Sequence, residues 1–265
     1  MHGLGNDFIV IDATQNPFNL NTAQIQKLGN RHLGIGFDQL LIIEKSPDPT
    51  KYDFAYRIFN NDGSEVGNCG NGARCFAKYV YEKKVTNKKQ LQIATQKSTM
   101  LLSILDNGLI QVNMGQPQFD PKTLPLQSEA TQTLYELEGI QFGAVSLGNP
   151  HAVITVPHLE LNIEPIAQIL QTHPAFSESV NVGFMEIVDA SHINLRVYER
   201  GAGETQACGT GACAAVAVGI QQNLLTSPVR VKLAGGNLDI IWETPNEPLF
   251  MIGEASFVFE GSIEI

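Results

Sequence analysis

Two copies of one cysteine-glycine motif constrain the fold of this chain more than any other feature of its sequence. Cys69-Gly-Asn-Gly-Ala73 and Cys208-Gly-Thr-Gly-Ala212 both read C-G-x-G-A, and Glu65 and Glu204 each lie four residues before the cysteine. Two shorter matches precede each copy in the same order: Leu4-Gly-Asn6 with Leu147-Gly-Asn149, and Gly36-Phe37 with Gly183-Phe184. Three matches in one order, with only loop-sized differences in spacing, indicate a duplicated domain.

A proline-rich segment near the middle of the chain marks the expected boundary between the copies. Residues 116–121 contain Pro117 and Pro121, and Pro125 follows soon after. Proline removes a backbone donor and restricts the residue before it, so this segment reads as a linker or loop. We therefore expect an N-terminal domain at 1–115, completed by a C-terminal strand at 255–265, and a C-terminal domain at 116–254.

The remaining pattern is mostly short strands with one prominent helix in each half. Runs rich in Ile, Val and Leu predict strands at residues 8–11, 39–44, 91–94, 100–105, 109–112, 144–147, 152–156, 184–188, 193–198, 229–233, 238–242 and 249–252. Residues 73–81 place Ala73, Phe76, Ala77 and Val80 on one helical face, and residues 212–220 are apolar all round. The expected class is α/β (α+β). Two pseudo-symmetric domains would each wrap a sheet around a central helix, with the active site in the cleft between them.

Charge and hydropathy exclude several functional classes. Among 265 residues, Lys and Arg number 17 and Asp and Glu number 27, giving a formal net charge of −10. We expect no nucleic-acid partner, because phosphate binding needs a basic face. The first apolar run, Phe8–Ile11, is bracketed by Asp7 and Asp12 and does not resemble a leader, and no apolar run is long enough to span a membrane. A cytoplasmic location is therefore expected.

The position of each cysteine suggests acid-base chemistry. The first N–H groups of a helix lack intrahelical partners and carry partial positive charge, which stabilises a thiolate and lowers its pKa. The flanking glycines allow close backbone approach, so a substrate carboxylate could also dock on these N–H groups. Two such turns facing one carbon could remove a proton from one side and return one to the other. Cys69 and Cys208 are therefore candidate catalytic residues.

Less specific interpretations apply to parts of this pattern. Cys75 and Cys213 lie inside the predicted helices and read as core residues. A zinc site would need further ligands, but no histidine cluster completes either cysteine pair, so no metal is expected. His151 could be a core or loop histidine, although its place directly after Leu147-Gly-Asn149 makes it a candidate site residue.

Taken together, these motifs resemble the diaminopimelate epimerase family. The resemblance runs from Met1 to the carboxyl terminus and rests on Met1-His-Gly-Leu-Gly-Asn-Asp-Phe8, Gly36-Phe-Asp-Gln-Leu40, Asn61-Asp-Gly-Ser-Glu-Val66, Cys69-Gly-Asn-Gly-Ala-Arg-Cys75, Gly148-Asn-Pro-His151 and Tyr198-Glu-Arg-Gly-Ala-Gly-Glu-Thr-Gln-Ala-Cys-Gly-Thr-Gly-Ala212. It implies a cofactor-independent epimerase that converts LL-2,6-diaminopimelate to the meso form in bacterial lysine and peptidoglycan-precursor synthesis. It also implies a two-domain α/β fold and a homodimer.

The resemblance assigns a role to each matching residue. In the LL-to-meso direction, Cys208 would be the proton acceptor and Cys69 the proton donor, while His151 and Glu199 would tune the pKa of the thiols. The implied substrate contacts are Asn6, Gln39, Asn60, Gly70, Asn71, Asn149, Asn181, Glu199, Arg200, Gly209 and Thr210. The charges fit a second amino-acid head, because a carboxylate suits Arg200 and an ammonium suits Glu199.

Two rival interpretations remain open on the sequence alone. Proline racemases and hydroxyproline epimerases share a duplicated fold and a cysteine pair, but they resemble this chain poorly over residues 198–204. A non-catalytic module that binds an amino acid or a metal could use the same cysteines. Assays with proline and diaminopimelate would separate the first rival, and metal analysis of the purified protein would separate the second.

Overall fold

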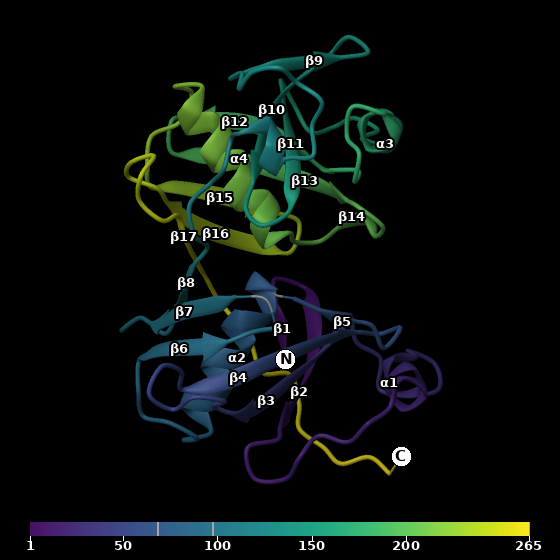
Figure 1. The fold of residues 1–265 in the computed structure, drawn as a ribbon, viewed down its shortest axis with the longest axis vertical. Helices are drawn as coiled ribbons and strands as arrows, with labels where there is room; N and C mark the ends of the chain where they lie inside the picture. Colours follow the sequence, from purple (N-terminus) through teal and green to yellow (C-terminus); the bar gives the residue numbers. More distant parts are fainter. Residues whose placement is uncertain (68, 97, 265) are drawn as a thin grey trace. The chain divides into compact units, whose positions relative to one another are not determined.

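The backbone builds one folding unit from both ends of the chain and a second unit from its middle. The computed structural model describes residues 1–67, 69–96 and 98–264. The first unit comprises Met1–Asn113 and Ile252–Ile265, and the second comprises Met114–Met251. Both units mix strands and helices (Figure 1), which confirms the predicted α/β class with two domains. Among the described residues, no helix has the length and apolar character needed to cross a membrane.

Strands account for most of the regular elements in each unit. The first unit contains β1 (His2–Gly3), β2 (Asn6–Asp12), α1 (Thr22–Gly29), β3 (Gln39–Lys45), β4 (Phe54–Asn60), β5 (Glu65–Val66), α2 (Gly70–Glu82), β6 (Gln90–Ala94), β7 (Thr99–Ile104) and β8 (Ile110–Asn113). The second contains the 3-10 turn η1 (Pro121–Thr123), β9 (Tyr135–Leu137), β10 (Ile140–Ser146), β11 (Pro150–Val156), α3 (Glu164–Thr172), β12 (Asn181–Asp189), β13 (His192–Glu199), β14 (Gly203–Thr205), α4 (Gly209–Gln221), β15 (Val229–Leu233) and β16 (Gly236–Ile241). The chain returns to the first unit through β17 (Phe250–Gly253).

The duplication seen in the sequence is also present in the strand pairing. In the first unit β2 pairs parallel to β3, β3 pairs antiparallel to β4, and β4 pairs antiparallel to β5 and parallel to β6. The second unit repeats this arrangement with β11, β12, β13, β14 and β15 in the same roles. The parallel pairs β2–β3 and β11–β12 are connected through α1 and α3, and the parallel pairs β4–β6 and β13–β15 through α2 and α4, because parallel pairing requires a long connection. Equivalent positions can therefore be read across by strand register, in which Gln39 of β3 corresponds to Asn181 of β12. The expected match of Gly36-Phe37 with Gly183-Phe184 is wrong in this register, because the first pair precedes β3 whereas the second lies inside β12.

Each unit packs its sheet around the helix that follows the cysteine. Helix α2 packs against β1, β2, β3, β7 and β8, and helix α4 packs against β10, β11, β12, β13 and β16 (Figure 1). Ala73, Phe76, Ala77 and Val80 of α2 are all fully buried, as the helical face in the sequence predicted. Helix α4 is buried nearly all round, and its many alanines allow the strands to approach it closely. The predicted sheet around a central helix is therefore confirmed in both units.

Both central helices begin three residues earlier than the periodicity indicated. Helix α2 starts at Gly70 and α4 at Gly209, because Cys69 and Cys208 are themselves the N-cap residues. Apolar periodicity detects only the turns that face the core, so it misses a glycine-rich first turn. The cysteines therefore lie at the helix termini and not in a preceding loop.

The carboxyl terminus differs from the expected strand at 255–265. Residues 255–264 form a single bridge, between Ser256 and His2, and otherwise make no ladder. Val258 and Phe259 are exposed, so this segment buries no apolar strand face at these positions. Ile265 lies outside the described residues.

Candidate active site

Cys69 lies at the start of α2 with its sulfur turned toward the helix terminus. It has an extended backbone (φ −151°, ψ 115°), and the backbone N–H of Gly72 donates to its Sγ over 3.4 Å. The side chain is partly exposed. A sulfur that accepts from an otherwise unpaired helix N–H is in the position that the sequence predicted for a thiolate.

Cys208 occupies the related position at the start of α4 but has different neighbours. Its Sγ donates to Oε2 of Glu199 over 3.1 Å, and Thr210 Oγ1 lies 3.6 Å from it. The side chain is buried. Burial, followed by the negative charge of Glu199, raises the pKa of Cys208 well above its ordinary value. The expectation that the helix terminus lowers the pKa is therefore wrong for Cys208 in this state, since loss of water and a carboxylate outweigh the helix dipole.

Asparagine and glutamine side chains of the first unit form two hydrogen-bonded pairs among the predicted site residues. Asn6 Oδ1 accepts from Nδ2 of Asn71, the second residue of α2, over 3.3 Å. Gln39 and Asn60 face one another across β3 and β4, and Gln39 Nε2 donates to Asn60 Oδ1 over 3.0 Å. Among the described residues, no donor reaches the buried Gln39 Oε1. These amides offer both donors and acceptors to a zwitterionic ligand.

A second polar network surrounds Cys208. Asn149 Nδ2 donates to Thr210 Oγ1 over 3.4 Å, and Asn149 Oδ1 lies 3.2 Å from His151 Nε2. Asn181 is buried, with Nδ2 donating to Pro150 O over 3.1 Å and Oδ1 accepting from the backbone N–H of Arg200 over 3.0 Å. These bonds join the ends of β11, β12 and β13 to the first turn of α4.

His151 is held as a neutral imidazole. The residue is 1% exposed, and burial, followed by the charge of Arg200, lowers its pKa to about 3. Its Nδ1 is buried and has no hydrogen-bond partner among the described residues. A neutral ring whose Nε2 donates to Asn149 would leave Nδ1 as an unused acceptor.

The structure gathers the predicted site residues into two sets, one in each unit. Asn6, Gln39, Asn60, Gly70 and Asn71 lie in the unit of Cys69, and Asn149, His151, Asn181, Glu199, Arg200, Gly209 and Thr210 lie in the unit of Cys208. Gly70 and Gly209 are the first residues of their helices. The Arg200 guanidinium is exposed, and its Nη1 donates to the carbonyl oxygen of Glu178 over 2.5 Å.

Sequence reasoning missed a duplicated ion pair just ahead of each cysteine. Arg57 of β4 donates from Nε and Nη2 to Glu65 of β5 over 2.8 and 2.9 Å. Arg196 of β13 donates in the same way to Glu204 of β14 over 2.7 and 2.8 Å. The signal was available, because an arginine lies eight residues before the repeated glutamate in both copies. Each bidentate pair fixes the short hairpin that leads into the cysteine turn.

The second cysteine of the first motif is a poor thiolate ligand for a metal. Cys75 is fully buried inside α2, and burial raises its pKa to about 12. Within the part of the chain that the structure describes, no three His, Cys, Asp or Glu side chains are grouped so that they could hold a metal ion.

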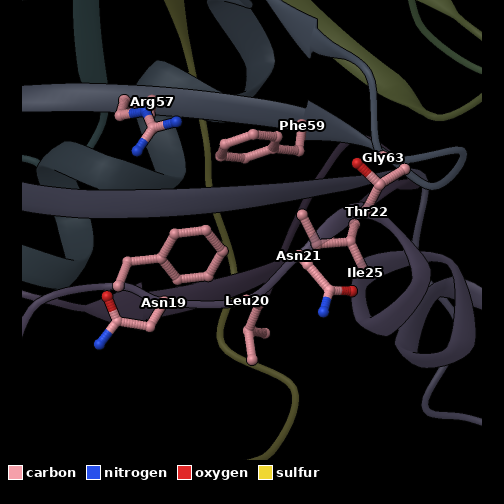
Figure 2. A pocket seen from close by; sticks show the side chains of 9 residues that line it. Asn19, Leu20, Asn21, Thr22, Ile25, Arg57, Phe59 and Gly63 are labelled. Carbon is pink, nitrogen blue, oxygen red and sulfur yellow. The ribbon is translucent and has the colours of Figure 1, made fainter.

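A cavity of about 400 Å³ lies elsewhere in the first unit, and no predicted site residue lines it (Figure 2). Arg57 and Phe59 form one side, with the guanidinium 4.9 Å from the ring centre, and Leu20 lies on the other. In the second unit the related Arg196 donates from Nη1 to the carbonyl oxygens of Leu159 and Leu161, each over 2.8 Å. The two copies therefore differ in how the loop before the first helix meets this arginine.

Comparison with protein families decides the membership of the chain. The model of the diaminopimelate epimerase family matches residues 1–120 and 143–258, and these segments contain every predicted site residue. The chain belongs to the diaminopimelate epimerase family. Membership in the diaminopimelate epimerase family makes the protein an isomerase of the epimerase type. The interpretation as a non-catalytic module is thereby overturned.

Solved structures share the fold of this diaminopimelate epimerase family member at low sequence identity. A phenazine biosynthesis protein of the PhzF family from Bacillus anthracis is 17% identical with a TM-score of 0.70, over 100% of this chain and 95% of that one. A probable proline racemase from Agrobacterium radiobacter K84, with bound carbonate, is 14% identical with a TM-score of 0.65, over 98% and 92%. A hydroxyproline epimerase from Agrobacterium vitis, with bound trans-4-hydroxy-L-proline, is 14% identical with a TM-score of 0.64, over 96% and 87%. These similarities concern the fold.

Proposed function

We propose that this protein is a diaminopimelate epimerase that converts LL-2,6-diaminopimelate to the meso form without a cofactor. The observation that carries the proposal is the Glu199 carboxylate 3.1 Å from the Cys208 sulfur, with Arg200 as the next residue along the chain. A carboxylate and a guanidinium can bind the ammonium and the carboxylate of amino-acid head groups. The supply of meso-diaminopimelate for lysine and peptidoglycan precursors, in the cytoplasm, is the corresponding role in the cell.

The proposed reaction uses one thiolate and one thiol. The Cys208 thiolate removes the α-hydrogen as a proton and becomes a thiol, leaving a carbanion whose charge spreads onto the substrate carboxylate. The Cys69 thiol then donates its proton to the opposite face of the same carbon and becomes a thiolate. The N–H groups at the start of α2 and α4 would stabilise the charge that develops on the carboxylate oxygens.

Substrate binding itself would prepare Cys208 for this role. In the structure the Cys208 thiol donates to the Glu199 carboxylate, and that charge opposes formation of the thiolate. A substrate ammonium placed against Glu199 would neutralise this repulsion and lower the pKa of Cys208. The proton acceptor would therefore form when substrate is bound.

Proline or hydroxyproline epimerisation is the alternative within the same fold. Two of the similar structures carry proline racemase and hydroxyproline epimerase names, so the fold alone does not select the substrate. The exposed guanidinium of Arg200 favours diaminopimelate, because it offers a site for a second carboxylate and proline has a single amino-acid head. Activity on diaminopimelate or on proline therefore distinguishes the two functions.

Isotope labelling in deuterated water tests the proposed substrate and mechanism together. With LL-diaminopimelate, the early meso product should carry deuterium from Cys69 while the remaining LL pool stays unlabelled, since Cys208 returns only the hydrogen it removed. Proline incubated in parallel should not be racemised. Cys69→Ala should abolish inversion. Equal early enrichment of the two pools would contradict the two-thiol mechanism, and turnover of proline alone would contradict the substrate.

A homodimer is part of the same proposal. Val258 and Phe259 are exposed in the C-terminal segment, with 68% of the Phe259 surface accessible. Aromatic side chains left exposed in this way are enriched at protein interfaces. Light scattering should give a mass twice that of the chain for the wild type, and Phe259→Asp should shift it toward the monomer. A monomeric wild type would contradict this assignment.

A further inference from the structure

An ionic cluster outside the predicted site residues lies next to Asn6. Arg31 donates from Nη1 and Nη2 to the two carboxylate oxygens of Asp7, each over 2.8 Å, and from Nη2 to Asp38 Oδ1 over 2.9 Å. The backbone N–H of Asp38 donates to Asp7 Oδ1 over 2.8 Å. Asp7 belongs to β2 and Asp38 directly precedes β3, so the cluster ties together the starts of two parallel strands.

The second oxygen of Asp38 contacts the Asn6 side chain. Asn6 Nδ2 donates to Asp38 Oδ2 over 2.9 Å, and the same oxygen accepts from the backbone N–H of Asp7 over 3.1 Å. An ionised carboxylate can only accept hydrogen bonds, so the amide of Asn6 must turn its nitrogen toward Asp38. Its oxygen is then left to accept from Asn71 Nδ2 at the start of α2.

In the second unit the side-chain amide of the related asparagine has the opposite orientation. Asn149 presents Nδ2 to Thr210, which is the residue related to Asn71, and turns Oδ1 toward His151. The position related to Asp38 is Val180, which is buried and apolar. The two copies therefore place an amide oxygen beside the Cys69 helix start and an amide nitrogen beside the Cys208 helix start.

We propose that Asp38, held by Arg31, is a positioning residue that fixes the amide orientation of Asn6. With that orientation, the start of α2 offers an acceptor from Asn6 next to its own N–H donors. A substrate ammonium would then be drawn to the Asn6 oxygen while a carboxylate is drawn to the helix N–H groups, which sets how the reacting carbon is presented to Cys69. This step rests on the proposed function, because Asn6 contacts a substrate only there.

Replacement of Asp38 by asparagine would remove the requirement that the amide nitrogen of Asn6 face residue 38. The new side chain has the same number of heavy atoms in the same places. Donors lie on both sides of the carboxylate, with Arg31 on one and Asn6 Nδ2 on the other. The amide introduced at position 38 has a single acceptor oxygen, so its nitrogen would face either Asn6 or Arg31. When it faces Asn6, the Asn6 amide can flip to offer its oxygen to the new donor, and the acceptor beside Cys69 is lost.

Asp7→Asn is the matched control. It removes the same single charge from the cluster and disturbs the same arginine, but it leaves the bond between Asn6 and Asp38 in place. Asp38→Asn should raise KM for LL-diaminopimelate about tenfold, the usual effect of losing one hydrogen bond to a charged group. Asp7→Asn should stay within about twofold of the wild type, with similar urea midpoints for both variants.

Nuclear magnetic resonance of the Asn6 side-chain amide provides a readout that does not depend on turnover. Its signals can be assigned by their loss in Asn6→Ser, and they should move in Asp38→Asn but stay in place in Asp7→Asn. Unmoved signals in Asp38→Asn, or equal KM effects in the two aspartate variants, would overturn the positioning role. A wild type that is inactive on diaminopimelate would overturn the proposed function instead. The amide signals would still test whether Asp38 fixes the orientation of the Asn6 side chain.

Discussion

The Sγ of Cys208 lies 3.1 Å from the carboxylate of Glu199, whereas the position related to Glu199 in the first unit is Asn60. Both residues end the strand that precedes a short hairpin and a cysteine turn. Cys208 therefore lies against a negative charge, whereas the related strand end of the first unit carries a neutral amide. The Glu199 carboxylate contributes to the raised pKa of Cys208, and the first prediction tests its consequence.

Glu199→Gln should allow the Cys208 thiolate to form at lower pH. The carboxylate raises the pKa of Cys208 in addition to burial, so its removal lowers that pKa toward the ordinary value. The pH dependence of Cys208 alkylation, followed by peptide mass spectrometry in a Cys69→Ala background, measures the shift. Glu204→Gln is the control, because that carboxylate pairs with Arg196. A midpoint that stays the same or rises would contradict the role of Glu199.

His151→Gln should flatten the dependence of stability on pH under acid conditions. In the folded state the pKa of His151 is lowered to about 3, from 6.5 in the unfolded chain. The unfolded state therefore binds more protons between these values, and stability falls as pH drops, by about 1.4 kcal/mol per unit once well below 6.5. Urea midpoints at pH 7 and pH 5 should differ more for the wild type than for the variant. Replacement of the exposed His158 should leave the wild-type difference unchanged.

Gly72→Ala should destabilise the start of α2, even though alanine is the better helix former. An added Cβ at Gly72 would lie 2.4 Å from the hydroxyl oxygen of the buried Tyr56 and 3.1 Å from Leu41 Cδ2. Overpacking of this kind costs about 1–3 kcal/mol. Removal of the hydroxyl in Gly72→Ala with Tyr56→Phe should recover part of the loss in urea midpoint. No recovery, compared with Tyr56→Phe alone, would show that the clash lies elsewhere.

Cys69 should react with iodoacetamide well before Cys75 and Cys213. Cys69 is partly exposed and its sulfur accepts from a helix N–H, whereas Cys75 and Cys213 are fully buried and the pKa of Cys75 is raised to about 12. The thiolate is the reactive form, so the exposure of Cys69 and the raised pKa of Cys75 both favour earlier reaction at Cys69. Timed alkylation with peptide mapping of the native protein measures the order. Early modification of Cys75 would contradict the packing of α2.

The sequence predicted the central helices and most strands because their apolar patterns are local. It missed β4, where Arg57 interrupts the apolar side chains, because the charge is compensated by Glu65 on the next strand and that pairing is tertiary. It also missed α1, a helix of eight residues whose signal is the capping box between Asn21 and Gln24. That box is readable in a sequence and could have located the helix.

The candidate site was predictable to the extent that it is repeated. The shared motif identifies Cys69 and Cys208 without any structure, but the unlike surroundings of the two thiols depend on which strand ends reach each turn. The raised pKa of Cys208 follows from burial and from Glu199, which approaches through the pairing of β13 with β14. The orientation of the Asn6 amide likewise depends on Asp38, thirty-two positions along the chain.

The matching bidentate ion pairs, Arg57 with Glu65 and Arg196 with Glu204, indicate which features preceded the duplication of the chain. A feature that both copies share in the same register was present in the ancestral gene before it doubled, so the braced hairpin and its cysteine belong to that ancestor. Asn60 and Glu199, and likewise Asp38 and Val180, differ between the copies and therefore diverged afterwards. The scaffold is thus older than the chemical difference between its halves, and duplication allowed each half to specialise without loss of the frame that holds it.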